Sequence, residues 1–193
     1  INGEFIDGVH VRWRPVDKAT GYAIYRSFDG CDDQNGMRVP IATVAGGNAD
    51  EFRDAEAEVG RQACYRVRAT TMFSHGPHSA PDEGCRGIPA PASVRASEGT
   101  STEAVELAWE PVDGAEEYKV QRDGHLVCTC PGAESACRDT NAPPGRKCRY
   151  TVCATKGKAT SQPAAATGCR GLNAPVGVAA SDGTDSACIA VKW

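Results

Sequence analysis

Cysteine is the residue type in this chain that could carry the most chemistry. The 193 residues include ten cysteines, which can pair as disulfides, bind zinc as thiolates or stay reduced. The closest two are Cys128 and Cys130, and the paired Cys-x-x-Cys spacing of a zinc ribbon does not occur. We therefore expect a disulfide framework, which persists in oxidising compartments outside the cytosol.

Two short segments offer the other candidate metal ligands. His75 and His78 lie three residues apart and could form half of a metal site, but a closed zinc site needs four ligands. Asp29, Asp32 and Asp33 could offer oxygens to calcium, although their spacing does not fit an EF-hand loop. We expect both segments to be solvated loops, and we predict no metal ion and no cofactor.

The chain lacks the sequence motifs of common catalytic sites. It has no Gly-x-Ser-x-Gly elbow, no His-Glu-x-x-His motif and no phosphate-binding loop. Its net charge is −4 with no basic stripe, which argues against nucleic acid as a partner. No apolar run approaches the ~18 residues that would cross a bilayer. We expect a protein that is not an enzyme, binds no nucleic acid and has no membrane span in this segment.

The segments that hold these cysteines recur along the chain. Trp13 and Trp109 each begin Trp-x-Pro-Val-Asp, and a tyrosine follows nine residues later, at Tyr22 and Tyr118. Further matches at constant offsets pair Phe52-Arg53-Asp54 with Cys137-Arg138-Asp139, Tyr65 with Tyr150, and Gly-Cys-Arg-Gly at 84–87 with the same letters at 168–171. We predict three units: 1–87, which lacks its first strand; 88–171, which is complete; and 172–193, the first two strands of a third copy.

The hydrophobic pattern predicts strands and not helices. Apolar and polar residues alternate with a period of two, as in half-buried strands. The alternating apolar sets are Val9, Val11 and Trp13; Val105, Leu107 and Trp109; and Ile189, Val191 and Trp193. Glycine- and proline-containing turns separate these runs, so each unit is predicted to be an all-β sandwich.

The strand motifs resemble those of fibronectin type III domains. They are the tryptophan on the second strand, Tyr-x-Val-x-Arg from Tyr118 and Tyr-x-Val-x-Ala from Tyr150. The Ala-Ser-Asp-Gly-Thr segment 180–184 resembles bacterial secreted members most. The resemblance covers nearly the whole chain and implies tandem immunoglobulin-like sandwiches, with strands A, B and E facing C′, C, F and G. It also implies that Tyr65 and Tyr150 are tyrosine-corner residues, whereas most members of the family carry no disulfides.

Within that strand order we predict the disulfides Cys64–Cys85 and Cys148–Cys169. In each pair one cysteine starts strand F and the other ends strand G. An antiparallel hairpin brings such positions within the ~4.4–6.8 Å between Cα atoms that a disulfide needs. The two pairs differ in register, because Cys148 stands two residues before its tyrosine and Cys64 only one.

Six cysteines remain without a unique partner. In the second unit two pairings are open: Cys128–Cys137 with Cys130–Cys153, or Cys128–Cys153 with Cys130–Cys137. Cys31 and Cys188 have no expected partner within their own copies. Cys188 could pair with a residue outside this segment, and Cys31 could pair with another chain.

The leading functional hypothesis is an extracellular or cell-surface array that acts as a stalk, fibre or adhesive filament. The alternatives are a spacer module of a secreted hydrolase and a receptor-like ectodomain that binds a protein. The expected partners are proteins, including neighbouring repeats or copies of the chain. A strand from residues 174–183 of another copy could complete the first unit, but we favour the alternative that the missing strand reflects a fragment boundary within a longer array.

Overall fold

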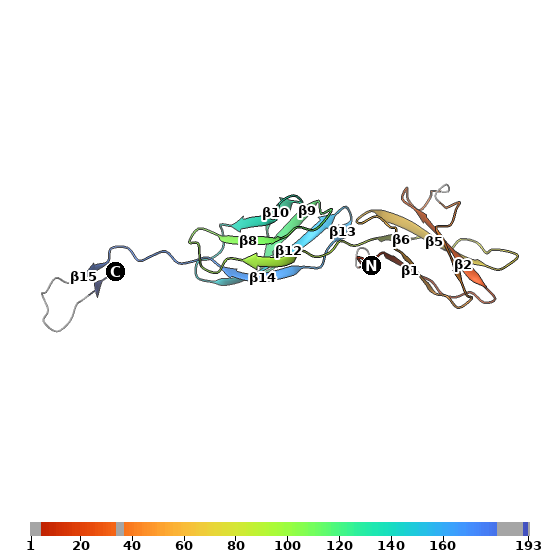
Figure 1. The fold of residues 1–193 in the computed structure, drawn as a ribbon, viewed down its shortest axis with the longest axis horizontal. Helices are drawn as coiled ribbons and strands as arrows, with labels where there is room; N and C mark the ends of the chain where they lie inside the picture. The colour runs from red at the N-terminus through yellow and green to blue at the C-terminus, as the bar shows by residue number, and fades with distance from the viewer. Residues whose placement is uncertain (1–4, 34–36, 181–190, 193) are drawn as a thin grey trace.

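The computed structural model describes residues 5–33, 37–180 and 191–192, and this part of the chain is all β. Figure 1 shows two elongated β units that follow one another along the long axis, with a short hairpin beyond the second. The strands of the first unit run from Val9 to Cys85, and those of the second from Ala92 to Cys169. Within the described residues, no helix has the length and apolar character needed to span a membrane.

The first unit consists of two antiparallel sheets. Its strands are β1 (Val9–Arg12), β2 (Gly21–Ser27), β3 (Ala42–Ala45), β4 (Glu51–Asp54), β5 (Gln62–Thr70) and β6 (Asp82–Cys85). β1 pairs with β4 in one sheet, and the other sheet has the order β3-β2-β5-β6. Side chains from both sheets form the core, among them Val9, Tyr22, Ile24, Tyr65 and Val67.

The second unit repeats this plan with two more strands. Its strands are β7 (Ala92–Ala96), β8 (Val105–Glu110), β9 (Glu117–Arg122), β10 (His125–Pro131), β11 (Ala136–Asp139), β12 (Lys147–Lys156), β13 (Ala159–Thr160) and β14 (Ala164–Cys169). One sheet has the order β11-β8-β7; the other runs β10-β9-β12, and β12 also pairs with β13 and β14. The predicted packing of strands A, B and E against C′, C, F and G is confirmed here.

β7 packs beside β14 in the second unit, where a Cβ atom on Gly168 would come 2.6 Å from the Cβ of Ala96. In the described part of the first unit the corresponding place is a groove of 560 Å³ along β1 and β6, lined in part by Trp13 and Tyr65. A strand from another copy in this place stays a prediction. Residues 181–183 of its donor segment lie outside the described residues.

Alternation along β8 shows why these sequences form strands. Val105, Leu107 and Trp109 are buried between the sheets, and the residues between them are exposed. The indole of Trp109 packs on the ring of Tyr118 with centroids 5.2 Å apart. The same two residue types meet in the first unit, Trp13 on Tyr22, at 5.1 Å. The period of two and the repeated Trp–Tyr spacing therefore produce one core design in both units.

The short hairpin after the second unit has the register of β7 and β8. β15 (Ala179–Ala180) pairs with β16 (Val191–Lys192), with Ala180 opposite Val191. The matching pair in the second unit is Ala96 opposite Leu107. Cys188, Ile189 and Trp193 of the third copy lie outside the described residues.

An aspartate at the end of β4 and of β11 forms a buried ionic network with the tyrosine of strand F. Asp139 accepts hydrogen bonds from the Tyr150 hydroxyl at 2.9 Å, from Arg122 and from the backbone N–H of Asn141 at 3.1 Å. The first unit repeats this with Asp54, which the Tyr65 hydroxyl contacts at 2.8 Å. A tyrosine corner bonds its hydroxyl to the backbone, so the implied role of these tyrosines takes a different form here.

Candidate functional site

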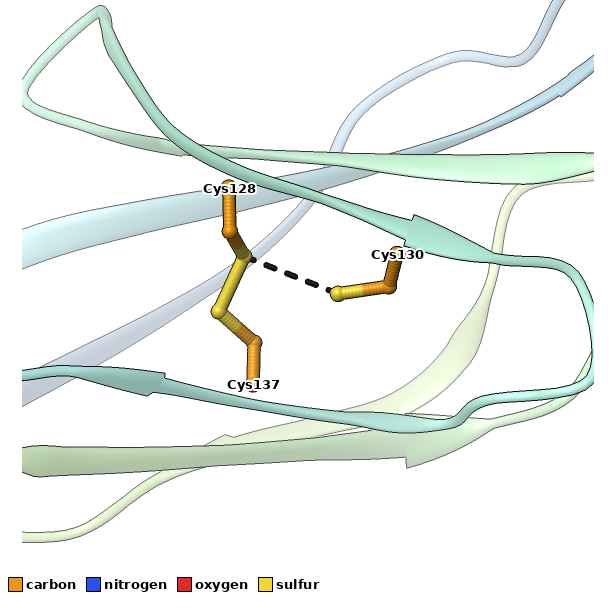
Figure 2. A group of neighbouring side chains, drawn as sticks. All are labelled: Cys128, Cys130 and Cys137. Atoms are coloured by element: carbon orange, nitrogen blue, oxygen red, sulfur yellow. Dashed lines mark hydrogen bonds between the residues drawn. A yellow bond between two sulfur atoms is a disulfide. The ribbon is translucent and has the colours of Figure 1, made fainter.

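Three cysteines converge between the two sheets of the second unit. Cys128 and Cys130 lie on β10 opposite Val120 and Tyr118 of β9, and Cys137 lies on β11 opposite Leu107 of β8. A β-bulge between Leu126 and Cys128 sets this register. Since Cys128 and Cys130 are two residues apart on one strand, both side chains point between the sheets. Figure 2 shows them above and beside the sulfur of Cys137.

Cys128 and Cys137 form a disulfide across the sheets, and Cys130 remains a thiol beside it. The Sγ atom of Cys130 lies 3.6 Å from the Sγ of Cys128 and 3.6 Å from the carbonyl oxygen of Ala136 (Figure 2). All three sulfur atoms lie within 4.8 Å of one another. This arrangement brings a nucleophile and a disulfide into one small cluster, which we call the three-cysteine cluster.

The environment of Cys130 keeps its thiol protonated. Its side chain is buried, and burial raises the pKa of the thiol, with a smaller contribution from the nearby carboxylate of Glu134. Thiolates, and not thiols, attack disulfides and bind metal ions. If the disulfide were reduced, the three sulfurs could act as ligands to a soft metal ion. With the disulfide formed, the chemistry available to the cluster is thiol–disulfide exchange.

Cys153 lies on the opposite face of the same sheet. In the strand register Cys153 of β12 stands opposite Lys119 of β9. Cys130 and Cys128 of β10 stand opposite the two residues on either side of Lys119. Because successive residues of a strand point to opposite faces, Cys153 cannot reach the cluster. The predicted alternatives Cys130–Cys153 and Cys128–Cys153 are therefore wrong, and of the pairs left open Cys128–Cys137 forms.

The prediction of Cys148–Cys169 is also wrong, because of the register of the strand F–G hairpin. Cys148 pairs with Gly168 and points into the core, and Cys169 pairs with Lys147. The two cysteines are thus one position out of register and point to opposite faces of the sheet. Both are thiols.

Cys64 pairs with Cys31 and not with Cys85. The Cys31–Cys64 disulfide has its Cα atoms 5.2 Å apart and packs on the outer face of the β2–β5 sheet with Tyr25 and Met37. On the hairpin Cys64 stands opposite Glu83, and Cys85 stands opposite Gln62 two residues away. The register places the predicted pair diagonally, where Cα atoms are about 7–8 Å apart. Cys31, expected to lack a partner in its own copy, has one.

The two candidate histidines point to different neighbours. His75 contacts the Arg68 guanidinium through Nδ1, and His78 packs its ring edge against Tyr25 with centroids 4.5 Å apart. Burial, followed by the charge of Arg68, lowers the pKa of His78. His78 is therefore neutral at physiological pH and acts as a packing residue.

The candidate calcium ligands lie in the loop after β2. Asp29 and Asp32 are exposed, and the Asp33 carboxylate accepts a hydrogen bond of 2.7 Å from the Ser27 hydroxyl. This bond closes the turn at the end of the strand, as short polar side chains commonly do. Residues 34–36 of the loop lie outside the described residues, and a calcium site here is not proposed further.

The junction between the two units is a second candidate site. The backbone N–H of Lys158, in the F–G turn of the second unit, donates to the carbonyl of Gly60 in the first at 2.9 Å. Cys85 and Ile88 are almost fully buried there, and with Val59 they extend the core of the second unit. Gly60 has φ of +73°, and a Cβ atom on it would lie 2.1 Å from the carbonyl oxygen of Lys156.

The far end of the second unit carries residues that correspond in sequence to those at the junction, and their apolar member is exposed. Gly145 has φ of +68° and donates its N–H to the carbonyl of Arg170, as Gly60 does to Arg86. Ile88 is 2% exposed at the junction, whereas its counterpart Leu172 is 72% exposed. The two ends therefore carry corresponding residues, which differ in the exposure of the apolar side chain.

Comparison with solved structures identifies the architecture. The chain superimposes on a two-domain fibronectin type III segment of chicken tenascin with a TM-score of 0.52 and 18% identity, covering 85% of this chain and 93% of that one. It also matches the FN1–FN3 domains of chicken contactin (CNTN1) at a TM-score of 0.40 and 16% identity, covering 86% of this chain and 61% of that one. A central fibronectin III array of RIM-binding protein matches at a TM-score of 0.39 and 19% identity, covering 98% of this chain and 75% of that one. No family model matches the sequence.

Proposed function

Because the chain has the fold of tandem fibronectin type III domains, we propose that it is a stiff, non-catalytic segment of an extracellular structural or adhesive array. The junction between residues 5–87 and 88–171 carries this proposal. Short loops and an apolar contact join the units there, so bending would break a hydrogen bond and expose buried side chains. The disulfides Cys31–Cys64 and Cys128–Cys137 favour an oxidising compartment, since such bonds are rare in the cytosol.

The junction supports an array because its two sides recur in one unit. The second unit contributes the F–G turn that contacts Gly60, and it also ends in Gly145 and Leu172, which correspond to Gly60 and Ile88. A module with both surfaces can contact a neighbour at each end. Repeat proteins are stabilised in this way, through nearest-neighbour interfaces.

Gly60→Ala and Gly145→Ala form a matched pair that tests the junction. Both glycines have positive φ, so either alanine should cost roughly 1–2 kcal/mol in backbone strain. Only the alanine at 60 would also collide with backbone of the neighbouring unit, at the Lys156 carbonyl. We expect Gly60→Ala to break the contact between the two units, so that they orient independently. We expect Gly145→Ala to leave that contact intact.

Residual dipolar couplings measured on the two units provide the readout. In the unmodified protein both units should share one alignment tensor, and in Gly60→Ala the tensors should differ. Independent tensors in the unmodified protein would contradict a stiff array. Isolating the native protein from the extracellular fraction with Cys31–Cys64 oxidised would support the proposed location, and finding these thiols reduced inside cells would oppose it.

A second function, binding a protein through a loop, is favoured by one observation. Met72 and Phe73, between β5 and β6, are 83% and 91% exposed at a turn that Thr71 and Ser74 close by hydrogen bonds. Exposed aromatic side chains are common anchors of interfaces. If the loop binds a partner on a surface, beads coated with the Phe73→Ser variant should adhere to that surface less than beads coated with the unmodified chain. Beads coated with the control variant Leu126→Ser should adhere as well as those with the unmodified chain.

A further inference from the structure

In the three-cysteine cluster, the sulfur of Cys137 on β11 has two possible bonding partners, which are the sulfurs of Cys128 and Cys130 on β10. Cys137 is bonded to Cys128, and Cys130 points into the same space from two residues further along the strand. No pair of sulfurs in the cluster is more than 4.8 Å apart. Only one of the two β10 cysteines can be bonded to Cys137 at a time, so the other is left as a thiol.

The two β10 positions differ in their access to solvent. Cys130 is 6% exposed, whereas Cys128 is only partly buried. β10 is also the edge strand of its sheet, with β9 as its pairing partner. A thiol at Cys130 is thus covered, and a thiol at Cys128 would lie nearer to the surface on an edge strand.

We propose that Cys128, Cys130 and Cys137 form an intramolecular thiol–disulfide exchange site, which moves the free thiol between a covered and an accessible position. In the forward step Cys130 loses its proton and its thiolate attacks the Sγ of Cys137. The Cys130–Cys137 bond forms as the Cys128–Cys137 bond breaks, and the electron pair leaves on the sulfur of Cys128, which takes up a proton. No cysteine is oxidised or reduced overall, so the step needs no external oxidant.

The accessible state provides a reaction with disulfides from outside the chain. The Cys128 thiolate would attack an external disulfide, form a mixed disulfide and release one external thiolate. The substrate class is therefore a small-molecule or protein disulfide. Because burial keeps the Cys130 thiolate scarce, the internal step should be slow and should control the overall rate.

Mapping the bonds of the unmodified protein tests the exchange directly. Native protein is treated with iodoacetamide for increasing times, quenched with acid, and cleaved after Glu134, which separates Cys130 from Cys137 in the sequence. Because Cys128 and Cys130 stay on one peptide and the two labelled forms have the same mass, the disulfide is then reduced and backbone fragmentation of this peptide by tandem mass spectrometry shows which of the two cysteines carries the label. We expect both isomers, with the fraction labelled at Cys128 growing over time as exchange replenishes it.

Two variants test whether labelling of Cys128 depends on thiol–disulfide exchange or only on the exposure of Cys128. Cys130→Ser removes the attacking thiol and should abolish labelling of Cys128, whereas Cys153→Ser removes a thiol on the other face and should leave that labelling unchanged. Only Cys128–Cys137 at every time point would overturn the proposal, and so would a Cys128–Cys130 bond. Equal labelling of Cys128 with and without Cys130 would overturn it as well. The mapping of unmodified protein decides the matter even if a variant fails to fold.

Discussion

Single residues in this protein take their roles from the face of the strand on which they lie. Asp139 is almost fully buried, and its two oxygens accept bonds from a tyrosine hydroxyl, an arginine and a backbone N–H. A buried carboxylate is tolerated when its hydrogen-bonding capacity is met in this way. The network also raises the pKa of Tyr150, through burial first and then through the hydrogen bond to Asp139.

Tyr150→Phe should destabilise the second unit by about 1–3 kcal/mol, because the buried carboxylate of Asp139 loses one donor. Urea unfolding followed at Trp109 measures the loss. Tyr65→Phe is the matched control. It removes the corresponding tyrosine hydroxyl, which donates to Asp54, and it should affect only the first unit. A change below about 0.5 kcal/mol in both variants would show that the arginine and the backbone N–H satisfy the carboxylate without the tyrosine.

At the scale of elements, the position of a cysteine relative to its tyrosine decides its partner. Cys148 lies two residues before Tyr150 and shares its inward face, whereas Cys64 lies one residue before Tyr65 and points outward to Cys31. The alternation of β8 and the repeat offsets predicted all-β units, and the resemblance to fibronectin type III domains implied how the strands divide between the two sheets. Of the disulfides, Cys128–Cys137 was among the open pairings, but Cys31–Cys64 was not predicted, because it depends on a loop path and a hairpin register that the repeat pattern leaves free.

The same limit applies to the candidate site. Asp54 and Asp139 lie at the same offset in the two copies, on the inward-facing side of the alternating pattern, and this could have indicated two buried acids. Their arginine partners lie on other strands, so the sequence pattern does not identify them. The bulge that turns both Cys128 and Cys130 inward has no glycine to mark it. The convergence of three sulfurs therefore followed only from the three-dimensional arrangement.

Cys31→Ser should destabilise the first unit by roughly 3–4 kcal/mol, the expectation for a disulfide that closes a loop of this length. Calorimetry should show an earlier transition for the first unit and an unchanged one for the second. A reductant should lower the first transition of the unmodified protein but not that of the variant. An unchanged first transition in Cys31→Ser would mean that the disulfide contributes nothing to folding stability.

At the scale of the whole molecule, two equivalent cysteines report on whether a unit has a neighbour. Cys85 ends β6 at the junction and is 4% exposed, and Cys169 ends β14 at the far end and is partly exposed. Burial raises the pKa of Cys85. The difference arises from the second unit, which covers Cys85 together with Ile88.

Alkylation of native protein should therefore label Cys169 at least tenfold faster than Cys85. Replacing Ile88 with aspartate should open the junction and raise the rate at Cys85, while Leu172→Asp should change neither rate strongly. Peptide masses after timed labelling provide both rates. Equal rates at Cys85 and Cys169 in the unmodified protein would mean that the junction opens faster than the label reacts.

If the junction is as stiff as proposed, the contact between Gly60 and the Lys158 amide sets one rotation between the two modules. If Gly145 and Leu172 receive their neighbour in the same way, every later joint turns the chain by the same angle and in the same sense. Modules added one after another would then wind into a screw, and any loop present in each module would trace a spiral along its surface. The pitch of such a screw would follow from the geometry of this single joint.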